Sequence, residues 1–175
     1  MIKVAVIFAN GTEEIEALTP VDIVRRCENA ICDIVSVNGE FPKGSHGIVV
    51  KADKLSEQVN FDDYHALVIP GGMPGAVNIA NDKDVSRALK NASNDGKVVA
   101  SICASPAVVL ADKGLIKGKK ATCYPAPIFI DKMKDCCFTS VDVEVDGKLI
   151  TANGPKSAMP FALEICKALG INPKF

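Results

Sequence analysis

The sequence has little net charge and neither a long basic run nor a long apolar run. The chain has twenty Lys and Arg residues and twenty-one Asp and Glu residues. The densest basic cluster is Lys117, Lys119 and Lys120, which we interpret as a solvated loop. Proteins that bind nucleic acids have a much stronger basic footprint, so we expect no nucleic-acid partner.

No stretch reaches the ~20 apolar residues that a membrane-spanning helix needs. The apolar run at residues 2–9 has only the length of a strand, and it lacks the basic region and cleavage site of a secretory signal. We therefore expect a soluble, cytoplasmic protein that does not engage a membrane.

Cysteine spacing is as informative as cysteine number. The chain has seven cysteines, an odd number, and no two of them have the C-x-x-C spacing of zinc sites and redox dithiols. We expect most of them to be small buried side chains in a reducing compartment, and we expect no metal and no cofactor. They are Cys27, Cys32, Cys103, Cys123, Cys136, Cys137 and Cys166.

Strand-like and helix-like patterns alternate along the whole chain, which we interpret as one domain over residues 1–175. Strands are expected at residues 2–9, 32–37, 48–52, 66–69, 97–102 and 121–124, and a hairpin around Asp146 and Gly147 in 141–152. Helices are expected at 12–28, 84–92, 106–110, 127–133 and 157–169, with Thr12 at the start of the first and Pro20 kinking it. This order predicts an α/β fold: a doubly wound, mostly parallel sheet in a three-layer sandwich, with ligands at the carboxyl ends of its strands.

The stretch at residues 97–110 places Cys103 where a buried strand becomes a helix without a loop. Ser101 and Ser105 lie two residues before and after it, the positions that must be small in a nucleophile elbow of the G-x-S-x-G type. A strained turn and a helix N-terminus would expose the sulfur and lower its pKa. The alternative is an inert, buried cysteine.

Only two histidines are available as a base for this thiol. His65 precedes a strand and should lie at the wrong end of the sheet, whereas His46 lies in a loop that could reach the crevice or simply be exposed. Glu16 is the best-placed carboxylate. Burial beside a thiol would raise its pKa, while the alternative is a solvated first-turn glutamate.

The turn containing Gly71 and Gly72 has the wrong spacing for a phosphate-binding or dinucleotide-binding loop. It does let backbone N–H groups approach a ligand, as an oxyanion hole requires, although it could also be a simple tight turn.

Four stretches together resemble the ThiJ/PfpI superfamily and, within it, the DJ-1 branch: NGTEEIEALTPVDIVRR, VIPGG, ASICASPAVVLADKGL and ANGPKSAMPFALEICKAL. The resemblance implies a flavodoxin-like fold related to class I glutamine amidotransferases, a homodimer, and an oxidation-sensitive elbow cysteine, here Cys103. It also implies a protonated Glu16 bonded to the sulfur and backbone donors at Gly71, Gly72 and Ala104. Substrate contacts are expected from His46, Gly154 and Pro155.

Activities implied by the resemblance are a cofactor-independent glyoxalase or deglycase acting on reactive aldehydes or on glycated thiols and amines. Alternatives are a redox sensor or chaperone with little turnover and, less favoured, a PfpI-type cysteine peptidase. Tyr124 stands at the position of the family's active-site histidine, where it would orient or protonate the second oxygen of the substrate, although a phenol does not exchange protons near neutral pH as an imidazole does. Activity could therefore be weak.

The first helix carries an apolar stripe of Ala17, Val21 and Val24 that could serve either the core or a subunit interface.

Overall fold

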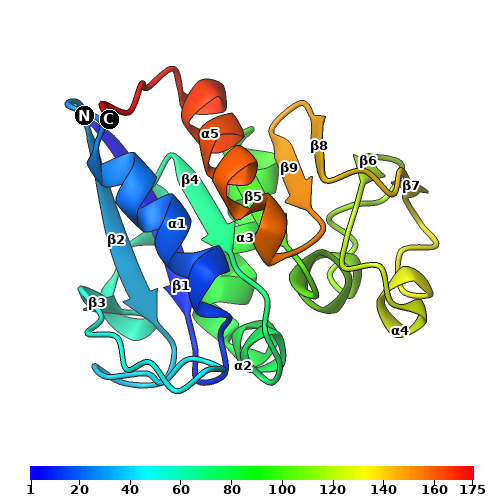
Figure 1. Ribbon diagram of the computed structural model, residues 1–175, viewed down its shortest axis with the longest axis horizontal. Coiled ribbons are helices and arrows are strands. Elements are labelled where there is room, and N and C mark those ends of the chain that lie inside the picture. Colours follow the sequence, from blue (N-terminus) through cyan, green and yellow to red (C-terminus); the bar gives the residue numbers. More distant parts are fainter.

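The computed structural model describes residues 1–175 and is built on a seven-stranded sheet with strand order β3-β2-β1-β4-β5-β9-β8 (Figure 1). All neighbouring strands are parallel except β8 and β9, which form the expected antiparallel hairpin. The strands are β1 Ile2–Phe8, β2 Ala30–Ser36, β3 Lys54–Leu55, β4 Ala66–Ile69, β5 Val98–Ile102, β8 Val143–Asp146 and β9 Leu149–Ala152.

Helices cover both faces of this sheet. Along β1, Val4 and Val6 pack into a core beneath α1 (Glu14–Arg25) and α5 (Ala158–Leu169). Ala5 and Ile7 point the other way, into a second core under α2 (Gly75–Asn81), α3 (Lys83–Asn94) and η3 (Pro106–Ala111). Strands apolar on both faces are what a doubly covered parallel sheet requires, so the predicted three-layer α/β sandwich is confirmed.

The remaining elements are short. They comprise the single turns η1 Ser56–Gln58, η2 Phe61–Asp63 and η4 Pro155–Ser157, the helix α4 Pro127–Ile130, and β6 Lys120–Ala121 paired in parallel with β7 Cys137–Phe138 as a separate two-stranded sheet.

Helix α1 starts differently from the prediction. Thr12 is not its cap, because its hydroxyl accepts a hydrogen bond from the N–H of Ala9 at 2.9 Å. Glu13 is the cap, with its carboxylate accepting from the N–H of Glu16 at 2.9 Å. The helix then runs through Pro20 without interruption to Arg25, three residues short of the predicted end.

The apolar stripe on α1 belongs to the core. Ala17, Val21 and Val24 are each at most 5 % exposed within the chain itself, so they are not free to form a subunit interface.

Two predicted strands are misplaced and one helix was missed. Residues 48–52 do not join the sheet, because the N–H groups of Val50 and Ala52 bind carbonyls of residues 40–42 in the same loop, and β3 follows instead at Lys54–Leu55. The strand predicted at 121–124 is shorter and lies in the small β6–β7 sheet. Helix α2, which follows the glycine-rich turn, was not predicted.

None of the helices is long and apolar enough to cross a bilayer. All seven cysteines are unpaired, and four of them are buried.

Candidate active site

Cys103 follows β5 at the predicted elbow. Its φ of +65° lies in the left-handed region that non-glycine residues rarely adopt, so the backbone is strained at this residue. Its N–H donates to the carbonyl of Ala152 at 2.9 Å, and its carbonyl accepts from the N–H of Tyr124 at 2.8 Å. These two bonds hold the elbow from the side of β9 and from the segment after β6.

The flanking serines are fully buried, as the elbow geometry requires. Ser105 donates from its hydroxyl to the carbonyl of Pro70 at 2.6 Å, which ties the elbow to the glycine-rich turn after β4. Ser101 fills the other small position, and its hydroxyl has no hydrogen-bond partner.

Both glycines of that turn are needed for space. A Cβ on Gly71 would lie 2.6 Å from the Cβ of Cys103 and 2.7 Å from Oε2 of Glu16, so no side chain fits between the thiol and the carboxyl. Gly72 has a φ of +89°, and a Cβ there would overlap backbone atoms of Gly11 and Glu13. The strands β1, β4 and β5 are neighbours, and this packing brings the segments after their carboxyl ends together.

Glu16 lies completely buried beside Cys103. The N–H of Gly71 donates to Oε2 at 2.8 Å, so it is not free to be the oxyanion donor that was expected, because Glu16 already occupies it. Oε1 has no partner within hydrogen-bonding geometry. Burial raises the pKa of Glu16 to about 7, the interaction with Cys103 and the Gly71 N–H lower it, and the charge of Glu13 raises it. A carboxyl of this kind holds a proton at mildly acidic pH and exchanges it near neutrality.

The pKa of the Cys103 thiol is displaced in the opposite direction from the sequence prediction. Burial raises it, and so does the neighbouring carboxyl of Glu16, whereas the N–H groups of Ala104 and Gly72 lower it. The two acids are neighbours with only Gly71 between them, so ionisation of one opposes ionisation of the other. A thiolate therefore forms most readily when the proton resides on Glu16.

Tyr124 lies next to the elbow through its backbone bond to Cys103. The residue is 43 % exposed. Its ring packs edge-on against Phe129 with centroids 6.3 Å apart, and a ring carbon lies 3.4 Å from where a Cβ on Gly154 would be. Tyr124 and Gly154 are therefore in contact beside the elbow. Pro155 follows Gly154 as the first residue of η4, and its expected contact with substrate stays a prediction.

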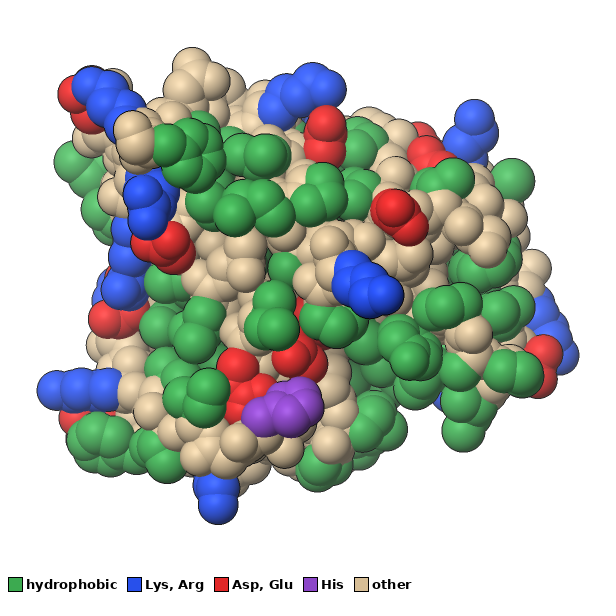
Figure 2. Space-filling model, in the orientation of Figure 1, with side chains coloured by type: hydrophobic (Ala, Val, Ile, Leu, Met, Phe, Trp, Pro, Cys, Tyr) green, Lys and Arg blue, Asp and Glu red, His purple; other side chains and the backbone are tan.

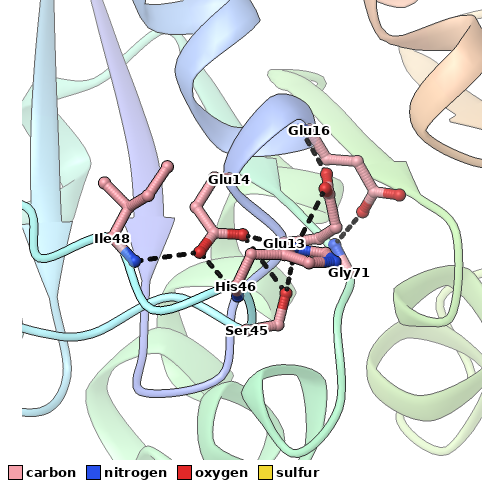
Figure 3. Close-up of polar contacts among 7 residues, drawn as sticks. All are labelled: Glu13, Glu14, Glu16, Ser45, His46, Ile48 and Gly71. Atoms are coloured by element: carbon pink, nitrogen blue, oxygen red, sulfur yellow. Dashed lines mark hydrogen bonds and ion pairs between the residues drawn. The ribbon is translucent and has the colours of Figure 1, made fainter.

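The loop that contains His46 lies against the first turn of α1, as Figure 3 shows. Nδ1 of His46 is 2.9 Å from Oε2 of Glu14 and 3.8 Å from Oε1 of Glu13. Glu13, Glu14 and His46 are close enough to meet at one ion, but Glu14 is already satisfied by hydrogen bonds from the loop. His65 is at the far end of β4, as predicted, where its ring accepts from the N–H of Lys3.

Glu14 is the site residue that sequence reasoning missed. Its position in the first turn of α1 suggested only a favourable interaction with the helix dipole. Its four hydrogen bonds come from a loop more than thirty positions away, and no local pattern signals them.

Comparison with known proteins identifies the family of this chain. The model of the DJ-1/PfpI family matches residues 2–168. This chain belongs to the DJ-1/PfpI family. The structure of oxidised DJ-1 from Toxoplasma gondii superposes with a TM-score of 0.91 at 40 % identity, covering 97 % of this chain and 91 % of that one.

Among DJ-1/PfpI relatives, a deglycase from Pyrococcus horikoshii is 35 % identical over 95 % of this chain and 99 % of its own length. DJ-1 homolog B of Arabidopsis thaliana is 36 % identical over 95 % of this chain. The chain spans 38 % of the length of that plant protein and 41 % of its homolog A.

Proposed function

We propose that this DJ-1/PfpI protein is a cofactor-independent glyoxalase or deglycase that acts on 2-oxoaldehydes such as methylglyoxal, or on their adducts with thiols and amines. The observation that carries the proposal is the contact between Cys103 on its strained turn and the buried, protonatable Glu16. The deglycase from Pyrococcus, which matches over nearly its whole length, supports the same class of reaction.

The reaction begins when the sulfur of Cys103 adds to the aldehyde carbon, forming a C–S bond while the carbonyl oxygen takes up the thiol's proton through Glu16. In this proposal the N–H groups of Gly72 and Ala104 stabilise the developing oxyanion; their support is that both favour negative charge on the sulfur. Ionised Glu16 then removes the hydrogen from that carbon, giving an enediol, and returns the proton to the neighbouring carbon. The resulting thioester reacts with water to release lactate and the free thiol.

Each step keeps atoms and electrons balanced, since methylglyoxal and water together have the composition of lactic acid. Proton transfer of this kind contributes ~10² to 10⁴ in rate. A carboxyl with a pKa of about 7 suits it, because both protonation states are populated at neutral pH.

Lactate formation from methylglyoxal tests the proposal. We expect Cys103→Ala and Glu16→Gln to lose turnover by at least ~10²-fold. Cys137→Ala, which changes an exposed cysteine on β7, is the matched control and should retain full activity. Unchanged turnover in either of the first two variants would falsify the assignment.

A redox-responsive function is the second candidate, and the oxidised form of one relative favours it. The Toxoplasma DJ-1 structure is described as oxidised. Here Cys103 is partly exposed, and a protonated Glu16 could donate a hydrogen bond to a sulfinate formed from the thiol by two equivalents of peroxide. We therefore propose a redox-responsive role, including that of a chaperone, as the alternative. Mass spectrometry after mild peroxide treatment should find sulfinate concentrated at Cys103. Oxidation spread uniformly over all seven cysteines would exclude a special site.

A PfpI-type peptidase is less favoured, because Tyr124 holds the family's histidine position and no histidine follows Cys103 in the chain. The family also leads us to propose a homodimer in the cytoplasm, which light scattering and fractionation would test.

A further inference from the structure

One buried carboxylate organises the loop beside the proposed site. The side chain of Glu14 is 5 % exposed. Its Oε1 accepts from the N–H of His46 at 2.7 Å and from that of Ile48 at 3.4 Å. Its Oε2 lies 2.9 Å from Nδ1 of His46 and accepts from the hydroxyl of Ser45 at 3.2 Å (Figure 3). All four donors come from residues 45–48, so the loop closes around a single carboxylate.

The loop also packs directly on α1. The N–H of Ser45 donates to the carbonyl of Thr12 at 2.8 Å, and a Cβ on Gly44 would overlap the carboxylate of Glu14. Figure 2 shows acidic side chains and a histidine gathered together on this face, bordered by hydrophobic side chains. The loop therefore has one defined position against the first turn of α1.

That position places His46 beside the first turn of α1, the turn that also carries Glu16 (Figure 3). The ring lies 3.8 Å from the carboxylate of Glu13, and Glu13 in turn accepts the N–H of Glu16, the proposed proton carrier. Because Nδ1 is bound to Glu14, the ring is oriented, and Nε2 has no partner within the chain. The side chain is 71 % exposed, so a substrate entering from solvent can reach Nε2.

We propose that Glu14 and His46 form a carboxylate–imidazole couple that supplies the second proton-transfer group of the site. His46 exchanges a proton through Nε2 with the substrate oxygen that Cys103 does not bind. Glu14 is a positioning residue that fixes the ring and its tautomer. The inference rests on the proposed function and gives to His46 the role for which the phenol of Tyr124 is unsuited.

The charges around the ring agree with this role. From α1, the hydrogen bond and the charge of Glu14 raise the pKa of His46, desolvation lowers it, and the charge of Glu13 raises it. From its own loop the ring meets the neutral hydroxyl of Ser45 at 3.1 Å, while the Lys43 side chain runs past Gly47. Burial opposes ionisation of Glu14, yet the hydrogen bonds from His46 and Ile48 lower its pKa overall. Glu14 therefore stays ionised while His46 titrates.

The test combines ring titration by NMR with the pH dependence of kcat for lactate formation. Glu14→Gln keeps the size of the side chain and an acceptor for the His46 and Ile48 amides but removes the charge. We expect it to move the titration of His46 to lower pH. The part of the pH dependence of kcat that reports the ionisation of His46 should move by the same number of pH units. His46→Gln should remove that part and lower kcat on the order of 10²-fold, with little change in KM.

His65→Gln is the control, because that ring lies at the opposite end of β4 against Lys3. It assigns the two histidine signals and should leave the kcat profile unchanged. If the wild type turns over and His46→Gln has the same profile, the couple is wrong while the proposed function stands. If the wild type makes no lactate, the proposed function is wrong, and an unmoved His46 titration in Glu14→Gln then also rules out the couple.

Discussion

Replacing Glu16 by glutamine should make the protein more stable at alkaline pH relative to the wild type, because the buried carboxyl is costly to ionise. Burial moves its pKa from an ordinary value of 4.5 to about 7. At roughly 1.4 kcal/mol for each pH unit between the two values, the difference amounts to about 3 kcal/mol. The side chain has no exposed surface over which solvent could screen this effect.

The direction follows from proton binding. Between pH 4.5 and about 7 the folded chain keeps the proton on Glu16 and the unfolded chain has lost it. The free energy of unfolding therefore falls as pH rises through this window. The stabilising contribution is complete below about pH 4.5 and is lost above about pH 7. Glutamine has no such dependence, and it can still accept the N–H of Gly71.

Urea unfolding at several pH values between 4.5 and 9 measures the effect. Both proteins should carry Cys103→Ala, since the thiol titrates together with Glu16. We expect the difference in unfolding free energy, protein with Glu16→Gln minus protein with Glu16, to grow by at least about 3 kcal/mol from the acid to the alkaline end, because the interaction with Cys103 that lowers the pKa of Glu16 is absent from both. Glu57→Gln changes an exposed glutamate and corrects for net charge. A difference that stays constant with pH would refute the reasoning.

Three further predictions concern the elbow and its surroundings. Gly72→Ala should destabilise the fold by at least ~3 kcal/mol in urea, because its Cβ meets backbone; Gly39→Ala has a similar φ but open space and should cost about 1 to 2 kcal/mol. Ser105→Ala removes a buried hydrogen bond and should cost about 1 to 3 kcal/mol in the same assay. Tyr124→His should restore lactate formation in His46→Gln by at least ~10-fold, and no gain would argue against interchangeable proton carriers.

The sequence determined the architecture and the central pair of the site. Strands apolar on both faces, separated by helices, fit only a doubly covered parallel sheet, and the small residues on both sides of Cys103 indicated an elbow because a tight turn excludes larger ones. Glu16 could be chosen because the first helix starts where β1 ends, a relation fixed by local sequence and sheet topology.

Tertiary packing decided the rest. Residues 48–52 have the composition of a strand, yet they form hydrogen bonds within their own loop. β-propensity does not distinguish pairing with the loop from pairing with the edge of the sheet. The thiol of Cys103 was expected to be acidic from the adjacent helix, but burial and the neighbouring carboxyl outweigh that influence, and both depend on segments far away in the chain. For the same reason Glu14 looks like an ordinary helix-terminal acid in the sequence: desolvation and hydrogen bonds exist only once distant residues have closed around a group.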